Sequence, residues 1–258
     1  MNNEYNQDKK EIIEKFKEIN KQGFISTNSR NSNSSGILLE NLLGRRGYEF
    51  NIPDYGTIEI KTLRDYNKAE IDLFSSSADG LYIYPMKWLS ENYGYPDKIY
   101  KNIKIITGNI YANKLNKIGL YYYYRLNVDT FNQKINIHIY NRKKELINND
   151  IFWDFSTLKE KLLRKDKHLA IFTIEKYKEN NIWYVKYNNL EIYTLKSFEE
   201  FINCIKNGIV SLTIKTGVNK SGYKKGEFKD HGASFRIEKN NMHYLFDKEY
   251  IHTNYNSN

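Results

Sequence analysis

Apolar and polar residues follow two different periods along this chain, which predicts a mixture of helices and strands. Helices are predicted in four segments with a helical pattern, 9–21, 36–44, 156–165 and 197–208, and in the mixed segment 86–94. In the second segment, Ser34 or Ser35 is a candidate N-cap and Gly44 a helix end. In the segment 197–208, Ser197 and Glu200 have the spacing of a capping box. Residues 98–106 show neither period and are predicted to be irregular.

Alternating apolar and polar residues predict strands at 57–63, 119–128 and 134–140, and further strands are predicted at 170–178, 182–188, 209–216 and 233–239. The second and third of these are predicted to form a hairpin, and so are the fourth and fifth. Polar loops are predicted at 26–35 and 218–232, and a turn at 51–56. The segment 233–239 is predicted to be the last strand. Because strands and helices interleave, the fold class is α/β or α+β.

The composition is that of a basic chain, long enough to bury a hydrophobic core without disulfide bonds or a structural metal. It has 258 residues, 40% of them hydrophobic, and carries 40 Lys and Arg against 31 Asp and Glu, a net charge of +9. This charge favours a polyanionic partner. Lys far exceeds Arg, however, and Asn, Ile and Tyr abound, as in AT-rich genomes, so the alternative is that codon usage accounts for part of the charge.

The same composition excludes several classes of protein. One cysteine, Cys204, cannot form an intrachain disulfide, which gives no sign of an oxidising compartment. No apolar run approaches the roughly 18 residues that cross a bilayer, and the N-terminus lacks the apolar stretch of a signal peptide. We therefore expect a soluble, cytoplasmic protein.

The segment around the predicted strand 57–63 carries the most informative chemistry. Glu59 and Lys61 share one face of that strand, and Ile58 and Ile60 share the other. Asp54 comes from the turn just before. Asp54 and Glu59 can hold a hard divalent cation, for which Mg²⁺ is suited, and the Ile60 carbonyl is a further candidate ligand. Lys61 can then orient a water molecule. The alternative is that these charges form an ordinary solvated strand face.

The order of short motifs along the chain resembles the MvaI/BcnI group of restriction endonucleases, in the MutH-type branch of the PD-(D/E)xK nucleases. The resemblance spans roughly residues 34–240 and rests on these segments: Leu39–Gly44 (LENLLG), Pro53–Gly56 (PDYG), Glu59–Lys61 (EIK), Tyr93–Tyr95 (YGY), Asn116–Leu120 (NKIGL) and Asp230–Ile237 (DHGASFRI).

This resemblance implies roles for the acidic segment. Asp54 and Glu59 would be Mg²⁺ ligands and Lys61 the water-orienting residue. Glu40 would be an additional acid near the metal; the alternative is a glutamate on the helix surface. It also implies an α/β PD-(D/E)xK core, with a mixed central sheet flanked by helices and two lobes around a DNA cleft. We place the catalytic lobe at 1–112 and the recognition lobe at 113–258, with interleaving left open.

A second set of residues has the chemistry for reading DNA bases. Asp can accept a hydrogen bond from cytosine N4, and Arg can donate two to guanine. Asp230, His231 and Arg236 lie within seven residues, and the resemblance implies that they face the major groove. Lys215 is a further candidate, although the family pattern has an Asp-x-Arg where this chain has Thr213-Ile214-Lys215. Lys224 and Lys225 suit phosphate contacts. A turn, a surface strand and a solvated loop are the alternatives.

These inferences together predict a type II restriction endonuclease. It would hydrolyse double-stranded DNA at a short sequence with Mg²⁺, leave 5′-phosphate ends and act as a monomer, with a cognate DNA methyltransferase as its genetic partner. One alternative is a MutH-like repair nickase. The other is a basic DNA-binding module without catalysis, which the acids at positions 40, 54 and 59 argue against, because binding alone does not require them.

Overall fold

The computed structural model describes residues 2–27, 34–44, 52–64, 69–80 and 82–249. The chain forms two compact units, each assembled from separate stretches. Unit 1 comprises Met1–Ile71, Leu162–Lys196 and Lys239–Asn258, and unit 2 comprises Asp72–Lys161 and Ser197–Glu238. No single boundary along the chain therefore separates the two units. The assignment of catalysis to residues 1–112 and recognition to 113–258 stays a prediction.

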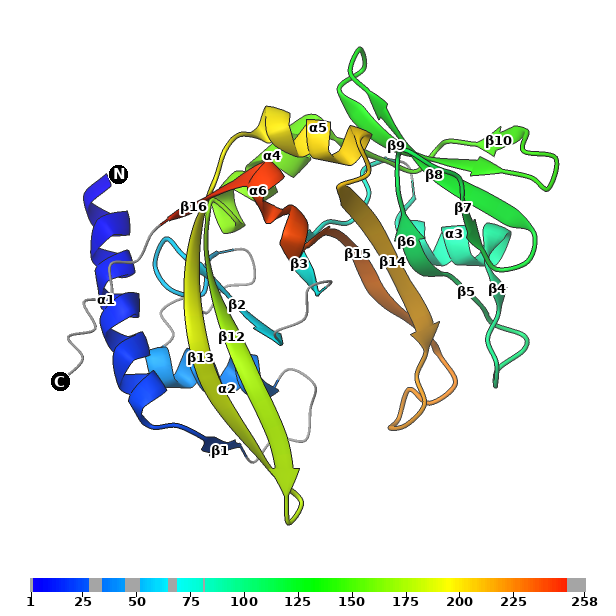
Figure 1. Ribbon diagram of the computed structural model, residues 1–258. Coiled ribbons are helices and arrows are strands. Elements are labelled where there is room, and N and C mark those ends of the chain that lie inside the picture. Colours follow the sequence, from blue (N-terminus) through cyan, green and yellow to red (C-terminus); the bar gives the residue numbers. More distant parts are fainter. Residues whose placement is uncertain (1, 28–33, 45–51, 65–68, 81, 250–258) are drawn as a thin grey trace. The chain divides into compact units, whose positions relative to one another are not determined.

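Unit 1 is built on a mixed five-stranded sheet (Figure 1). Its main path runs β1 (Ile25–Thr27), β13 (Ile182–Leu195), β12 (His168–Glu179) and β2 (Glu59–Arg64), and β16 (Phe246–Glu249) also pairs with β13. All pairs are antiparallel except β12 with β2. The first seven residues of β12 are buried, as expected of a strand covered on both faces.

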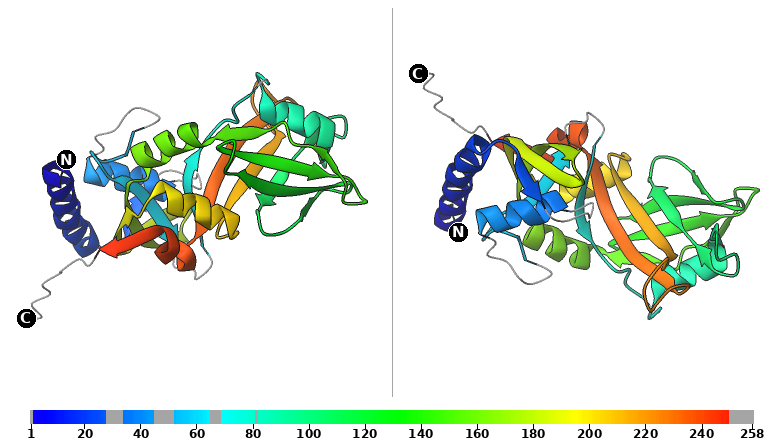
Figure 2. Two further views of the ribbon diagram at one scale, coloured as in Figure 1. Left: turned by 90° about the horizontal axis from the view of Figure 1, so that it is seen from above. Right: turned by 90° about the horizontal axis from the view of Figure 1, so that it is seen from below.

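Two helices supply most of the core that covers this sheet (Figure 2). Ile12, Phe16 and Ile19 of α1 (Asn2–Lys21) and Leu39 and Leu43 of α2 (Ser34–Leu43) are buried with apolar residues of β2, β12 and β13. Helix α2 begins at Ser34, so the prediction that Ser34 or Ser35 caps it from outside is wrong. The short η1 (Lys239–Asn241) and α6 (Met242–Leu245) precede β16.

Unit 2 contains two larger sheets and a two-stranded one. The first has the order β10 (Leu146–Asn148), β9 (Lys134–Tyr140), β8 (Tyr122–Asp129) and β7 (Asn116–Ile118), with β11 (Phe152–Asp154) also on β9. The second has the order β3 (Glu70–Ser75), β15 (Phe228–Glu238), β14 (Val210–Val218) and β6 (Thr107–Ile110). The small sheet pairs β4 (Tyr95–Pro96) with β5 (Lys104–Ile105). The remaining helices are α3 (Pro85–Tyr93), α4 (Phe155–Lys165) and α5 (Phe198–Lys206).

The predicted α/β class, the helices and both hairpins are confirmed. The cap of α5 is also confirmed, because the Ser197 hydroxyl accepts a hydrogen bond from the Glu200 backbone N–H at 3.1 Å. The prediction that 233–239 is the last strand is wrong, because β16 follows it. The basic loop is shorter than predicted, since β15 already begins at Phe228. Paired with β14, this polar stretch forms a strand that its own sequence pattern does not indicate.

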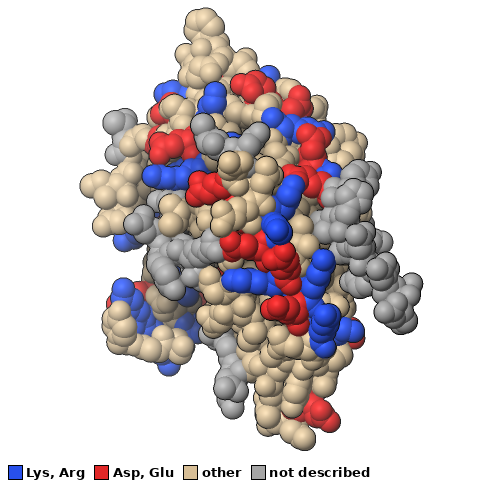
Figure 3. Space-filling model, turned by 90° about the vertical axis from the view of Figure 1, so that its left-hand side faces the viewer, with Lys and Arg blue, Asp and Glu red and all other residues tan. Residues whose placement is uncertain are grey.

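The structure also bears on membrane crossing and on how the surface charge is distributed. No described helix is long and apolar enough to cross a membrane. On the face shown in Figure 3, acidic and basic side chains are interleaved, so the net charge of +9 does not form a patch of one sign there. Cys204 is buried in α5, as the apolar face of that helix predicts.

Candidate active site

Asp54 lies in a tight turn that leads directly into β2. Tyr55 and Ile58 exchange backbone hydrogen bonds across this turn at 3.0 and 2.9 Å. Gly56 adopts a φ of +57°, a conformation that a residue with a Cβ rarely tolerates. The Asp54 carboxylate accepts a hydrogen bond from the backbone N–H of Ile60 at 3.3 Å. The turn therefore brings the carboxylate of Asp54 back onto the beginning of the strand.

Helix α1 fixes this turn from outside the motif. Asp8, which is buried, accepts hydrogen bonds from the backbone N–H and the hydroxyl of Thr57, both at 2.9 Å. The Tyr55 hydroxyl donates to Glu11 at 3.0 Å. The sequence analysis missed both acids, because their partners lie more than forty residues away and a helical pattern gives no sign of such contacts.

The structure brings Glu59 and Lys61 into direct contact in a largely buried environment. Lys61 Nζ donates to Glu59 Oε1 at 2.9 Å. Glu59 is only 3% exposed and Lys61 is half-buried, so the solvated-face alternative is wrong for Glu59. Ile58 and Ile60 are buried among the apolar residues of unit 1, as predicted, and hold the strand in place.

Two further charged residues, which the sequence analysis missed, complete this cluster. Lys165 at the end of α4 places Nζ 3.4 Å from Glu59 Oε1. Asp166, the next residue, is fully buried and places Oδ1 4.0 Å from Lys61 Nζ. Both reach β2 because β12, which starts at His168, runs parallel to it and pairs Leu169 with Glu59. We call Asp54, Glu59, Lys61, Lys165 and Asp166 the acidic cluster.

Burial and mutual charge shift the pKa values within the acidic cluster. Desolvation, and to a lesser extent the charge of Asp54, raises the pKa of Glu59. Desolvation raises the pKa of Asp166 well above its usual value, although Lys61 opposes this shift. Burial acts to lower the pKa of Lys61, but the charges of Asp166 and Glu59 outweigh it and raise this pKa. The cluster therefore favours a protonated lysine among carboxylates that lack full solvation.

The residues present fit a hard divalent cation, with Asp54 and Glu59 as its carboxylate ligands. Glu59 Oε2 is buried and has no hydrogen-bond partner among the described residues, whereas buried carboxylate oxygens normally have one. A cation beside it would satisfy this oxygen. Within the described ranges, no three acidic, histidine or cysteine side chains gather closely enough to hold a metal ion. The protein would thus supply two carboxylates, which suits Mg²⁺ with water and phosphate as its other ligands.

The backbone of Ile60 is oriented in keeping with its predicted role as a ligand. Its N–H donates to the Asp54 carboxylate. In a strand, the N–H and C=O of one residue point to the same side, so the Ile60 carbonyl also points toward the Asp54 side. Strand β2 lies at the edge of the sheet, which leaves that side without a neighbouring strand in the described structure. The coordination itself stays a prediction.

Glu40 lies on α2, the helix that packs against β2. Its side chain is half-buried. An added Cβ on Gly36, one turn earlier in the helix, would come within 3.7 Å of Thr62 Oγ1, so helix and strand approach closely. The predicted role of Glu40 as an additional acid beside the metal stays a prediction.

The predicted base-reading residues lie in unit 2, on the paired strands β14 and β15. The register places Ile214 opposite Ala233 but Thr216 opposite Asp230, so β15 has an extra residue at His231 and Gly232. This bulge puts Asp230 on the face of Thr216 and Leu212. Arg236, opposite Ser211, lies on the other face, together with Lys215. The structure thus places Asp230 and Arg236, which the sequence analysis treated as one set, on opposite faces of the strand pair.

The polar side chains at and near the bulge differ in their contacts and exposure. Asp230 accepts a hydrogen bond from the Gly232 N–H at 2.7 Å, which closes the turn of the bulge. His231 is exposed, and its pKa is lowered by desolvation and then by the charges of Lys229 and Lys215. Lys215 is exposed as well.

Arg236 is already held by a carboxylate. Its guanidinium donates to Asp72 of β3 through Nε, and through Nη2 at 3.1 Å. Ser234 donates to the same carboxylate at 3.1 Å. Asp72 is itself 56% exposed, so this ion pair lies at the surface. The arrangement fixes the direction of a side chain that would otherwise sample many rotamers.

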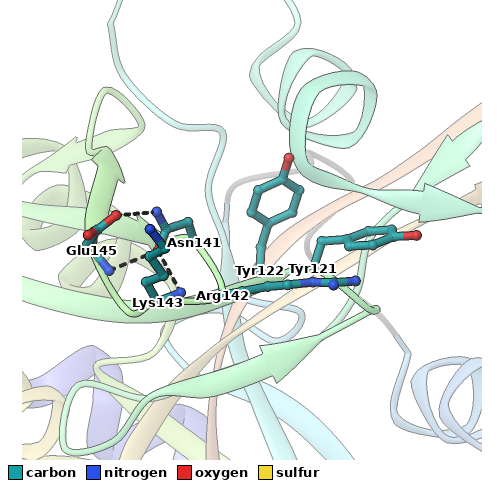
Figure 4. Close-up of a pocket in the computed structure, with 6 residues that line it drawn as sticks. All are labelled: Tyr121, Tyr122, Asn141, Arg142, Lys143 and Glu145. Atoms are coloured by element: carbon teal, nitrogen blue, oxygen red, sulfur yellow. Dashed lines mark hydrogen bonds between the residues drawn. The ribbon is translucent and has the colours of Figure 1, made fainter.

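Two other surface features of unit 2 are basic. Lys224 and Lys225 are exposed in the connection between β14 and β15. Their contact with phosphates stays a prediction. A shallow pocket of about 370 Å³ lies at one end of the β8–β9 hairpin (Figure 4). In it, the Arg142 guanidinium lies 4.4 Å from the ring centroid of Tyr121. None of the predicted site residues lines this pocket.

Comparisons with known proteins support the family that the motifs indicate. The sequence model of the MvaI/BcnI restriction endonuclease family matches residues 13–246. No curated protein sequence matches the chain. The structure is similar to that of restriction endonuclease MvaI in complex with its cognate DNA substrate, with a TM-score of 0.84 and 26% identity over 92% of this chain and 95% of that one.

A second structure, MvaI in the absence of DNA, has a TM-score of 0.60 at 26% identity and covers 94% of this chain and 96% of that one. Both similarities support the restriction-endonuclease-like fold predicted from the sequence. The family match covers far more than half of the chain, and its positions include the whole acidic cluster and the β14–β15 pair. This chain therefore belongs to the MvaI/BcnI restriction endonuclease family and is a site-specific deoxyribonuclease of type II.

Proposed function

We propose that this protein uses Mg²⁺ to hydrolyse double-stranded DNA at a short specific sequence, leaving 5′-phosphate and 3′-hydroxyl ends. The observation that carries the proposal is the buried contact between Glu59 and Lys61, with Asp54 turned back onto the same strand. Two carboxylates and one ammonium form a set that serves phosphodiester hydrolysis and has no structural need to be buried together.

Each residue of the set has a separate task. Asp54 and Glu59 would hold the divalent cation, which when bound offsets charge on the attacked phosphate and makes water a better nucleophile. Lys61, kept protonated by its neighbours, would donate a hydrogen bond that orients the attacking water and would offset negative charge that develops on the phosphate oxygens. Glu40, from α2, would be an additional acid near the metal site, apart from the two carboxylates that hold the cation.

DNA recognition would rest on the β14–β15 pair. Arg236 would donate to guanine, with Lys215 on the same face of the strand pair, and Asp230 would accept from cytosine on the other face, with His231 next to it in the bulge. Lys224 and Lys225 would contact phosphates without reading sequence. The MvaI structure with cognate DNA supports double-stranded DNA as the substrate.

Substitution of Asp54 or Lys61 by alanine tests the assignment. Each variant is expected to lose about 10³-fold or more in cleavage rate, because each lacks a group that acts on the reacting phosphate. DNA binding without divalent cation should be largely unchanged. Glu18→Ala, which removes an exposed acid from α1, is the control and should cut like the wild type. Cleavage by Asp54→Ala or Lys61→Ala at a near wild-type rate in Mg²⁺ would show that the active site is elsewhere.

We also propose that the protein acts as a monomer and cuts one strand at a time. Each chain has one acidic cluster, which can attack only one phosphodiester at once. Supercoiled plasmid should therefore pass through a nicked circle before it becomes linear, and the rate should rise linearly with enzyme concentration. Direct linearisation together with a dimer mass on DNA would rule out the monomer. Because such an enzyme endangers the DNA of its own cell, a cognate DNA methyltransferase is the proposed genetic partner.

A further inference from the structure

Asp166 is a buried acid for which the fold provides no hydrogen bond. Its side chain is fully buried, and neither carboxylate oxygen has a hydrogen-bond partner among the described residues. Its backbone N–H donates to the Leu162 carbonyl at 2.9 Å, which fixes the residue at the end of α4. A buried carboxylate without hydrogen bonds is costly, so its position requires another explanation than stability.

Asp166 lies within ion-pair distance of the ammonium of Lys61. Lys61 Nζ lies 2.9 Å from Glu59 Oε1 and 4.0 Å from Asp166 Oδ1. It therefore has one carboxylate partner at the start of β2 and another just before β12. Glu59 is shared, since Lys165 also lies 3.4 Å from Oε1. If Glu59 in addition holds a cation, its attraction for Lys61 weakens. Asp166 then remains as a carboxylate partner of this lysine.

We propose that Asp166 is a positioning residue for Lys61. Its carboxylate keeps the ammonium in place while Glu59 binds the cation, and it thereby limits the rotamers of a long, flexible side chain. Asp166 does not serve as a third ligand, because no three acids among the described residues gather closely enough for that. This inference rests on the proposed function, since it concerns the same site.

The test compares Asp166→Asn with a matched control, Glu191→Gln. Glu191 is also a buried acid of unit 1 with lysine partners, but it lies on β13, separated from β2 by β12. Single-turnover cleavage at saturating Mg²⁺ should slow at least tenfold in Asp166→Asn and less than twofold in Glu191→Gln. The Mg²⁺ concentration for half-maximal rate and DNA binding without metal should both change less than twofold in Asp166→Asn.

Two further results separate positioning from other roles. In a Lys61→Met background, Asp166→Asn should have no additional effect on the residual rate, because its effect passes through Lys61. The melting temperature of Asp166→Asn should not fall, since Lys61 keeps Glu59 as a partner and an amide is less costly to bury than a carboxylate. A fivefold rise in the Mg²⁺ requirement, an undiminished effect without Lys61, or a lower melting temperature would each overturn the proposal.

A readout without cleavage keeps the test separate from the proposed function. The Lys61 amine should react with acetic anhydride several-fold faster in Asp166→Asn than in the wild type or in Glu191→Gln, as measured by mass spectrometry of the peptides. If the wild type cuts no DNA, the proposed function fails, and this labelling still decides the role of Asp166: unchanged labelling overturns it. If Asp166→Asn does not fold, Asp166→Ser takes its place in every measurement.

Discussion

Gly56→Ala is expected to destabilise the protein because the new side chain would collide with the carboxylate of Asp8. Gly56 has a φ of +57°, which costs an alanine about 1–2 kcal/mol. In addition, the new Cβ would lie 2.6 Å from Cγ of Asp8, so the carboxylate must move. That carboxylate accepts two hydrogen bonds from Thr57, and losing one bond to a charged group costs about 1.5–3 kcal/mol. The expected loss in unfolding free energy is therefore about 2.5–5 kcal/mol.

Gly23→Ala is the matched control for the backbone cost. Gly23 also belongs to unit 1 and has a φ of +67°, but an added Cβ there meets nothing within 4 Å. Its loss should be only about 1–2 kcal/mol. Urea unfolding followed by circular dichroism measures both variants. In an Asp8→Ala background, Gly56→Ala should cost no more than Gly23→Ala. Equal losses for Gly56→Ala and Gly23→Ala in the otherwise wild-type chain would refute the role assigned to Asp8.

Two other predictions concern recognition and pH. Arg236→Ala should weaken binding to the cognate sequence by about 1–3 kcal/mol, whereas Lys224→Ala should weaken binding to all sequences alike and reduce the salt dependence by about one phosphate contact. Filter binding to cognate and scrambled duplexes across salt concentrations measures both effects. Equal losses of Arg236→Ala on the two duplexes would make Arg236 a phosphate contact. Burial, and after it the charge of Lys167, lowers the pKa of His168 from 6.5 to about 4, so in this range the unfolded chain binds a proton that the folded chain does not. The free energy of unfolding that depends on neutral His168 should thus be fully present above pH 6.5 and decrease as the pH drops toward 4. In urea unfolding measured across this pH range, His168→Asn should flatten the pH dependence. An unchanged slope in this variant would contradict the role of His168.

Local patterns predicted what local forces determine. The apolar spacing of 197–208 and the hydroxyl of Ser197 are sufficient to define α5, and alternation is sufficient for the β8–β9 hairpin. The strand of Glu59 and Lys61 was predicted with its faces correctly assigned. The burial of Glu59 was not, because alternation shows which residues share a face but not what covers it.

The missed residues all depend on long-range pairing. Asp166 and Lys165 reach β2 only because β12 pairs with it in parallel, and Asp8 contacts a turn from a separate helix. The bulge at His231 and Gly232 likewise depends on the register with β14. Single residues in helices and loops give no periodic signal of such contacts, so sequence patterns predicted the motif but not the charges that surround it.

The parallel pairing of β2 with β12 also determines the order in which a growing chain can become active. Lys61 pairs with Ile171, about a hundred residues later, and the stretch between them includes most of unit 2. At roughly 5–20 residues per second, the ribosome takes on the order of 5–20 s to synthesise this stretch. Until then Asp54, Glu59 and Lys61 lack the strand beside them and the acid that accompanies the lysine. An enzyme that cuts DNA is thus assembled late in its own synthesis, and fragments that end before residue 166 are expected to be harmless to the cell that makes them.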